Sequence, residues 1–206
     1  MNKTRVGDIC AIAYLTVIAI FFFFSIDGFI KATKAHPIVM GFIKVALLAT
    51  FGEFLKVRRQ SGTWNITHPV QRFIVWGIFG IWFTYAFPLF DVGTKDMIAK
   101  GTWPQWGNLF EAFSKSFWIN LAGGYGYVMM LTHEYFNKII EKQGLVDLTE
   151  FSDGLDKRIW FRFIPLTIFF FWIPAHTITF LLPGYFRVLM AAVLSVALGF
   201  ILTIKR

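Results

Sequence analysis

Long apolar runs separated by short basic clusters are the feature that most constrains what this chain can fold into. The runs lie near residues 9–26, 37–55, 73–90, 113–131, 161–182 and 186–203. The hydrocarbon core of a bilayer is about 30 Å thick, so a helix needs about 20 apolar residues to cross it. The runs therefore predict transmembrane helices, and we expect no soluble domain between them.

The composition agrees with this interpretation. Of 206 residues, 56% are hydrophobic and 16% charged, which is more apolar material than a soluble domain of this length can bury. We predict an all-α integral membrane protein, with residues 1–206 forming a single helical membrane domain of about six transmembrane helices. The last two runs flank Pro183-Gly184, so they form either a tight hairpin or one broken element, which would leave five.

The basic residues indicate topology rather than nucleic-acid binding. The formal charge is +8, but the lysines and arginines form short clusters between apolar runs instead of one basic face. When the loops are assigned alternately to the two sides, most of these cations fall on the side that holds both termini. We therefore expect both termini on the cytoplasm-like side, in a bacterial plasma membrane or an organelle inner membrane, which the sequence does not distinguish.

The first run has features of both a signal peptide and a membrane helix. Lys3 and Arg5 precede it, as in a signal peptide, but the apolar stretch is too long and no A-x-A cleavage signal follows. We interpret it as a helix. Cys10 is the only cysteine, which excludes an internal disulfide and any multi-cysteine metal site.

The connection before the fourth run predicts a short interfacial helix near 103–112. Thr102 and Gln105 have the spacing of a capping box, and Pro104 would lie in the first turn. The aromatic residues from Trp103 to Phe117 repeat at three and four, which gives one aromatic stripe. Later in the fourth run, we expect the small residues to allow close helix packing, namely Gly123, Gly124 and Gly126.

Catalytic and cofactor signatures are absent from the sequence. There is no phosphate loop, G-x-S-x-G motif or dinucleotide fingerprint. "THEYFN" begins like the helix of a zinc protease, but Asn137 stands where a second histidine is required. The histidines show no ligand spacing, so we expect no metal, no cofactor and no enzyme activity. In the last long connection, Ser152 or Asp153 is expected to cap a short helix that leads into the fifth run.

Polar residues interrupt the fifth run. At 100° per residue, one arc of about 60° holds Pro165, Trp172, His176, Thr179 and Pro183. Phe163, Phe170 and Leu181 lie opposite, and we expect Pro174 to kink the helix by removing a backbone hydrogen bond. Two interpretations stay open for His176 and Thr179: they line a polar path, or they hydrogen-bond to a neighbouring helix.

The second run carries two charges at membrane depth. Lys44 and Glu53 are nine residues apart, or about 180° on a helix, so they face different neighbours. For Glu53 we favour an ordinary pair with Lys56 near the helix end. Lys44 lies near the midpoint of the run, where an unpaired lysine costs about 2.5 kcal/mol or more. We favour a cavity-lining cation over a side chain that snorkels to the interface.

Three groups of residues resemble the Mpv-type and peroxisomal small membrane protein family. The first group resembles its opening H-P, G-D and Q pattern, with Glu in place of Asp: His36, Pro37, Gly52, Glu53 and Gln60. The second matches its glycine-rich motif: Arg72, Gly77, Gly80 and Asp91. The third resembles its W-P, N-F, V-P and R signature, and Leu202, Thr203 and Lys205 continue it: Trp172, Pro174, Phe180, Pro183 and Arg187.

The chain also departs from the pattern of this family. The proline, histidine and tryptophan-tyrosine pair of the second motif are missing, Thr179 replaces an asparagine, and Leu198 replaces a tryptophan. The resemblance, which covers about residues 33 to 206, implies a small helical bundle of an organelle-membrane family associated with pore formation and metabolite permeability. Because these residues are missing, the resemblance does not by itself imply that the chain shares the selectivity or gating of the family.

The leading hypothesis is a membrane channel or pore-like protein for small solutes, as a monomer or a homo-oligomer in the lipid bilayer. Its path would use Lys44, Glu53, Trp172, His176, Thr179 and Arg187. His176→Ala and Lys44→Leu would then alter permeation without unfolding the protein. Arg187 would either attract anions or anchor the chain at the interface, and we favour anchoring. The alternatives are a structural or assembly subunit, and a membrane enzyme acting on a lipid, which would need His176, Glu53, His133 or Lys44 to converge.

Overall fold

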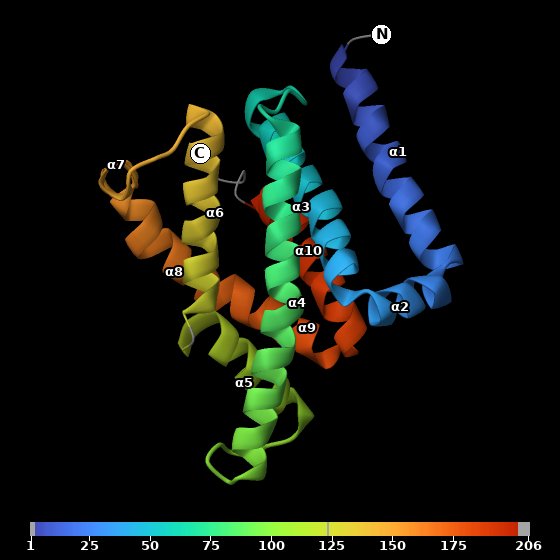
Figure 1. The fold of residues 1–206 in the computed structure, drawn as a ribbon, viewed down its shortest axis with the longest axis vertical. Helices are drawn as coiled ribbons and strands as arrows, with labels where there is room; N and C mark the ends of the chain where they lie inside the picture. The colour runs from blue at the N-terminus through green and yellow to red at the C-terminus, as the bar shows by residue number, and fades with distance from the viewer. Residues whose placement is uncertain (1–2, 123, 202–206) are drawn as a thin grey trace.

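The computed structural model describes residues 3–122 and 124–201, and regular structure in this part of the chain is helical throughout (Figure 1). The first half forms α1 (Lys3–Phe24), α2 (Ile26–Ala35), α3 (Pro37–Ser61) and α4 (Pro69–Ala99). The second half forms α5 (Asn108–Phe117), the π-helical turn η1 (Trp118–Ala122), α6 (Tyr125–Lys142) and α7 (Leu148–Asp153). A continuous helix follows, made of η2 (Ile159–Phe163), α8 (Ile164–Thr167), η3 (Ile168–Trp172) and α9 (Ile173–Leu181), and α10 (Gly184–Ile201) ends the described chain.

In the described part of the chain, four helices are long and apolar enough to cross a membrane: Arg5–Phe24, Pro37–Ser61, Pro69–Ala99 and Ile159–Leu181. A shorter apolar helix, Gly184–Ala197, follows the last of them. These helices have the length and composition of a multi-pass membrane protein, as the sequence predicts. The count of six spans is not confirmed.

The predicted span at 113–131 is interrupted in the structure. The chain runs through α5 and η1, and Gly124 then adopts a left-handed conformation with φ of 64° before α6 begins. Glycine populates this region without the steric cost that a Cβ atom brings. The run is therefore two helices rather than one span. Gly126 does lie close to a neighbour, since a Cβ placed on it would be 3.1 Å from the Asn120 carbonyl oxygen; Gly123 lies outside the described residues.

The interfacial helix expected at 103–112 begins later than predicted. Its first residue is Asn108, and Gly107 precedes it with φ of 90°. The capping box is wrong, because Thr102 instead donates its hydroxyl to the Met97 carbonyl oxygen at 3.0 Å. The aromatic stripe does form, and Trp106, whose ring lies 4.6 Å from Phe110, leaves 73% of its surface exposed.

α3 lies at the centre of the bundle and packs along α4 and α10 (Figure 1). Small residues bring the backbones together at both crossings. A Cβ atom on Gly41 would lie 2.8 Å from the Gly80 carbonyl oxygen, and one on Gly52 would lie 2.8 Å from the carbonyl oxygen of Ser195. Helices in membranes associate through such close approaches of small residues, because lipid supplies no hydrophobic force between them.

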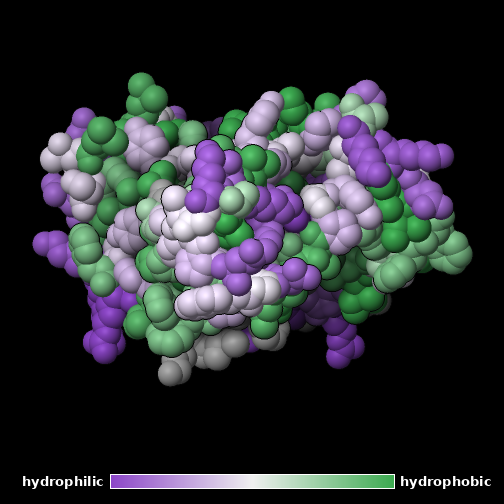
Figure 2. All heavy atoms as spheres, turned by 90° about the horizontal axis from the view of Figure 1, so that it is seen from below, coloured by the Kyte–Doolittle hydropathy of each residue, from purple (hydrophilic) through white to green (hydrophobic). Residues whose placement is uncertain are grey.

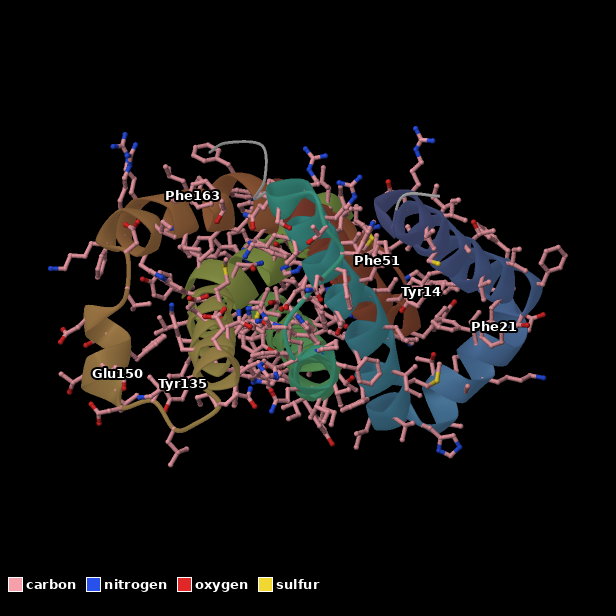
Figure 3. The ribbon with its side chains drawn as sticks, turned by 90° about the horizontal axis from the view of Figure 1, so that it is seen from above. Tyr14, Phe21, Phe51, Tyr135, Glu150 and Phe163 are labelled. Atoms are coloured by element: carbon pink, nitrogen blue, oxygen red, sulfur yellow. The ribbon has the colours of Figure 1, made fainter. Side chains whose placement is uncertain are left out.

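α1 packs loosely, and the most apolar 18-residue window of this helix is 0% buried against the rest of the chain. The Tyr14 ring stacks on Phe51 with 5.4 Å between centroids (Figure 3), and its hydroxyl donates to the Leu47 carbonyl oxygen at 3.1 Å. Nearer the start of α1, Asp8 accepts hydrogen bonds from Arg58 and Trp64, each at 2.8 Å. These contacts fix α1 to α3 and leave its outer face for lipid or a partner.

Aspartates other than the predicted residues cap the starts of α7 and of the long helix that follows it. Asp147 accepts a hydrogen bond from the Thr149 backbone amide at 2.8 Å, which lowers the pKa of this carboxyl and starts α7. Asp156 accepts one from the Arg158 amide at 2.8 Å and precedes the long helix. The expected caps, Ser152 and Asp153, lie inside α7 instead.

Both prolines of the fifth run follow a π-helical turn. The Ile164 amide bonds to the Ile159 carbonyl oxygen and the Ile173 amide to that of Ile168, five residues back in each case. Each turn therefore holds one residue more than an α-helical turn, directly before Pro165 or Pro174. The helix is therefore continuous from Ile159 to Leu181, and its irregularities before the two prolines are wide turns.

The bundle has two ends, which we name from Figure 1 as upper, at the α3–α4 loop (residues 62–68), and lower, at the α9–α10 turn (residues 182–183). α1 begins at the upper end, because Asp8 contacts Arg58 there. α10 runs from the lower end towards the upper one, and Gly199 reaches Gly52. The first and last described helices thus start and finish towards the same end, while their side of the membrane stays a prediction.

We expect Gly80→Ala to destabilise the bundle by about 1–3 kcal/mol, the usual cost of overpacking. A Cβ atom there would lie 2.9 Å from the Val45 Cβ and would press on the Gly41 carbonyl. Gly93→Ala on the same helix is the control, because nothing lies within 4 Å of its Cβ position. Thermal unfolding in detergent measures both; equal midpoints for the two variants would contradict the close crossing of α3 and α4.

Candidate functional site

A buried ion pair joins α3 to α4 in the upper half of the bundle. Arg72 Nη1 donates to Glu53 Oε2 at 2.8 Å, and the two side chains are only 9% and 12% exposed. Arg72 Nε also donates to the Thr67 carbonyl oxygen at 2.9 Å, so the arginine closes the α3–α4 loop as well. A charge pair at this depth is tolerated because each member neutralises the other and finds further hydrogen bonds.

α6 completes this cluster of polar side chains. His133 Nε2 lies 3.0 Å from Glu53 Oε1, which also accepts a hydrogen bond from Trp76 Nε1 at 2.7 Å. Asn137 Oδ1 accepts from Arg72 Nη1 at 3.0 Å, and its amide nitrogen lies 3.4 Å from His133 Nδ1. The Nε2–H tautomer of the histidine satisfies both neighbours. We name these five residues the upper network.

The upper network corrects one expectation and explains another residue. Glu53 pairs with Arg72 rather than with Lys56 on its own helix, because the side chain faces the bundle. Asn137 stands where the zinc-protease pattern requires a second histidine, and in the structure it accepts a hydrogen bond from the buried Arg72. Within residues 3–122 and 124–201, no group of three or more histidine, cysteine, aspartate or glutamate side chains is placed to hold a metal ion.

A second charged cluster lies in the lower half of the bundle and again includes α4. Asp91 receives Lys115 Nζ from α5 at 2.5 Å and Arg187 Nη1 from α10 at 3.1 Å. Lys95 reaches the same carboxylate at 3.3 Å, and Lys115 also contacts Glu111. These five residues form the lower network, in which three cations share two carboxylates.

A cavity of about 370 Å³ opens beside the lower network, between α2, α3, α4 and α10. Charged side chains around it come from each of these helices: Lys34, Lys44, Asp91 and Arg187. The remaining lining combines small, hydroxyl and apolar residues: Thr33, Pro37, Gly41, Thr84, Phe87, Pro88, Val92, Gly184, Tyr185 and Val188. Figure 2 shows the molecule from this end, with hydrophilic side chains near the middle of the face and others at its edges, and hydrophobic side chains between them.

Lys44 is the buried cation of this cavity. It is 5% exposed, its Nζ donates to Thr33 Oγ1 at 2.8 Å, and it lies 4.4 Å from the centroid of the Phe29 ring. Because α3 begins at Pro37, Lys44 stands about 10 Å from the start of the helix at 1.5 Å per residue. The midpoint of α3 (Pro37–Ser61) is five residues further on, so Lys44 lies nearer the middle of the helix than its start, as the sequence suggests.

His176 makes a contact between helices. Its Nδ1 lies 2.9 Å from Asn120 Nδ2, and that amide also donates to the Ser116 carbonyl oxygen at 2.9 Å. The His176 ring also packs edge-on against Phe87, with centroids 5.5 Å apart. Thr179 is 0% exposed and donates to the Ala175 carbonyl oxygen of its own helix at 3.0 Å. Hydrogen bonding to a neighbouring element therefore describes His176, whereas Thr179 bonds within its own helix, and a polar path along these residues stays a prediction.

A small cavity of about 20 Å³ lies next to this contact, enough for one water molecule. Tyr125 and Trp172 line it, and their Oη and Nε1 atoms are buried without a hydrogen-bond partner among the described residues. Trp172 thus belongs to a tightly packed layer with His176, whose ring centroid is 5.3 Å away.

The polar face predicted for the fifth run is only partly correct. Trp172 and Thr179 are buried, but Pro165 and Pro183 are exposed. The π-helical turn at Ile168–Trp172 adds a residue and so rotates Pro165 by about 100° relative to the residues after the turn, whereas Pro183 lies beyond the end of α9 at Leu181. Pro174 is exposed, and the Ile173 carbonyl oxygen beside it accepts a hydrogen bond from Ser116 Oγ at 2.7 Å.

The residues that carry the family resemblance have structural positions of three kinds. Gly52 and Gly80 lie at helix crossings, and Gly77 faces the Phe42 ring. Phe180 is in the core beneath the Arg187 guanidinium, 5.3 Å from it. His36 separates α2 from α3, and Gln60 is exposed near the end of α3. Leu202, Thr203 and Lys205 lie outside the described residues, as does the side chain of Leu198.

The structure brings together some sequence-predicted residues and separates others. Glu53 and His133 meet in the upper network, whereas Lys44 and Arg187 line the lower cavity. His176 belongs to neither group, so Glu53 and His133 are the pair that the fold brings together among the four residues named for a lipid enzyme. Sequence reasoning missed Lys115 and Asn120, although Glu111 and Lys115 at i,i+4 on an amphipathic helix were a usable signal.

A scan against protein-family models, a search of curated proteins and a search of solved structures each found no match for this chain.

We expect Arg72→Met to destabilise the protein by about 3–5 kcal/mol, because it leaves the Glu53 carboxylate buried and unpaired. The double variant Glu53→Gln, Arg72→Met should recover much of this loss, since no uncompensated charge remains. A double-mutant cycle on thermal unfolding in detergent measures the coupling. Additive effects of the two single changes would contradict a buried pair.

We also expect His176→Ala to reduce stability by about 1–3 kcal/mol, the cost of leaving the buried Asn120 amide without its partner. This replaces the earlier expectation of a folding-neutral change. Ile178→Ala, which alters an exposed side chain on the same helix, is the matched control in the unfolding assay. A His176→Ala protein as stable as the control would show that the Asn120 contact contributes nothing.

Proposed function

We propose that the protein lets small solutes pass the membrane and that the cavity between α2, α3, α4 and α10 is the mouth of the pathway. The observation that carries the proposal is the cavity itself, about 370 Å³ in volume and reaching the buried Lys44. Polar and charged groups at membrane depth are costly and by default indicate a functional pathway. A packing role alone would be met by apolar side chains.

The rest of the pathway is closed in the conformation described. Next to the cavity, Phe87 lines both it and the small space around His176 and Asn120. Above this layer, the upper network joins α3, α4 and α6 through Glu53, Arg72 and His133. A solute that enters the cavity therefore meets two barriers, and passage requires these contacts to separate. The proposal is a gated pathway rather than an open pore.

The resemblance to the Mpv-type family supports this proposal through the pairing of its residues. Glu53 of the first motif pairs with Arg72 of the second, and Asp91 of the second pairs with Arg187 of the third. Residues far apart in the sequence thus meet in two ion pairs, which gives the scattered matches a common physical role. We propose membership of that family on these grounds.

The test is efflux from liposomes that contain the purified protein and are loaded with solutes of graded size and charge. Val92 lines the cavity and is 65% exposed, so a Val92→Cys variant in a Cys10→Ala background can carry a bulky thiol reagent at the mouth. We expect size-limited efflux that slows several-fold after labelling. The matched control is Val70→Cys, on the same helix at the upper end and 69% exposed. Tight liposomes, or equal effects of labelling at both positions, would overturn the proposal.

A structural or assembly role is the second candidate, and the exposed outer face of α1 favours it. Side chains along this face are more than half exposed: Ile9, Ile12, Val17, Ile20, Phe21, Phe23 and Phe24. This role predicts tight liposomes and a stable complex in native membranes that is lost when the face is changed. The efflux experiment therefore separates the two candidates.

A further inference from the structure

Positive charge exceeds negative charge around the lower cavity. Three cations, Lys34, Lys44 and Arg187, line it together with one carboxylate, Asp91. That carboxylate is already shared, because Lys115 and Lys95 contact it as well as Arg187. The positive charge at the cavity is therefore not balanced by the protein itself, and an anion would complete it.

Lys44 retains hydrogen-bonding capacity that the fold does not use. An ammonium group has three donors, and Thr33 Oγ1 is the acceptor for Lys44 Nζ within the described part of the chain. The Phe29 ring covers another side of the ammonium at 4.4 Å. Because the side chain is 5% exposed and lines the cavity, a ligand there would meet a poorly hydrated cation, which strengthens a charge-assisted bond.

The first turns of two helices add to the positive electrostatic potential of the cavity. Pro37 begins α3 and Gly184 begins α10, and both residues line the cavity. The first turn of a helix carries unpaired amides and a partial positive charge, so it favours negative groups. Gly184 also leaves open space beside the backbone, since nothing lies within 4 Å of its Cβ position.

We propose that the cavity binds a small oxyanion, a phosphate or carboxylate group, between Lys44 and Arg187. This inference rests on the proposed function and assigns its solute class. The cavity volume of about 370 Å³ falls within the roughly 300–1,000 Å³ typical of small-molecule sites, which leaves room for the body of a small metabolite. The oxyanion belongs to a soluble solute or to a phospholipid headgroup, because the chemistry of recognition is the same.

The first arm of the test is a calorimetric titration of the full chain, in uncharged detergent, with inorganic phosphate and separately with acetate. We expect saturable binding that weakens with added salt, because the attraction is partly screened. Lys44→Met should weaken it by about tenfold or more, the loss of one charge-assisted bond. Lys44→Arg should retain it, and Lys34→Met should weaken it less, because Lys34 is exposed.

The matched control is Lys100→Met, which removes a lysine charge from an exposed i,i+4 pair with Asp96 outside the cavity. It should leave binding unchanged. If phosphate and acetate both fail to bind the wild-type protein, the second arm decides. Native mass spectrometry after reconstitution with phosphatidylglycerol should then show retained lipid that Lys44→Met releases and Lys100→Met does not.

Binding in the first arm identifies a soluble oxyanion, and Lys44-dependent retention in the second identifies a lipid headgroup. The proposal is overturned if neither occurs, or if Lys44→Met and Lys100→Met behave alike. Failure of the proposed function is a separate result, because it is read from liposome efflux and needs no anion. Efflux of neutral solutes without oxyanion binding would contradict the oxyanion site alone and leave the proposed pathway standing.

Discussion

Two buried ion pairs, both anchored on α4, hold this bundle together. Arg72 reaches Glu53 on α3, and Asp91 receives Arg187 from α10. The two α4 residues are nineteen positions apart, or about 28 Å along a helix, close to the thickness of the hydrocarbon core. If α4 spans the bilayer, each pair would lie near one edge of the apolar layer, where the cost of a charge is lower than at the centre.

The segment of α4 between these charges is packed with aromatic residues, and this explains why the two ends differ. Phe79, Phe83 and Phe87 are each less than 10% exposed and fill the middle of the bundle. The upper end is satisfied by its own hydrogen bonds, since Glu53 accepts bonds on both oxygens. The lower end keeps a cavity and an excess of cations, which is why the proposed anion site lies there.

Much of the fold follows from the sequence, because the hydropathy and length of a helical segment indicate whether it is suited to lipid or to water. The spans at 37–55, 73–90 and 161–182 correspond to observed long helices. The prediction of one span at 113–131 was wrong because hydropathy does not detect a left-handed glycine, and Gly124 turns the chain there. A helical wheel assumes a constant 100° per residue and so could not anticipate the π-helical turn that separates Pro165 from Trp172, nor the end of α9 at Leu181, which leaves Pro183 outside the helix.

The candidate site could be predicted residue by residue but not as groups. Lys44 and Glu53 were singled out because charges at membrane depth are rare, and Arg187 as a charge that would attract anions or anchor the chain at the interface. Each has a specific partner. The identity of those partners depends on tertiary contacts between helices that are far apart in the sequence, such as Arg187 with Asp91. Spacing along one helix could exclude a Lys44–Glu53 pair, but it could not choose among the other helices.

The π-helical turn before Pro174 has a mechanical consequence. It holds one residue more than an α-helical turn, and the Ile173 amide bonds to the Ile168 carbonyl oxygen across it. Changing it to a regular turn would rotate one half of the Ile159–Leu181 helix by about 100° against the other and shift it by about 1.5 Å. Such a screw motion would carry His176 away from Asn120 without unfolding either helix. The wide turn is therefore the point of the Ile159–Leu181 helix at which a change of one hydrogen-bond register would reorient His176.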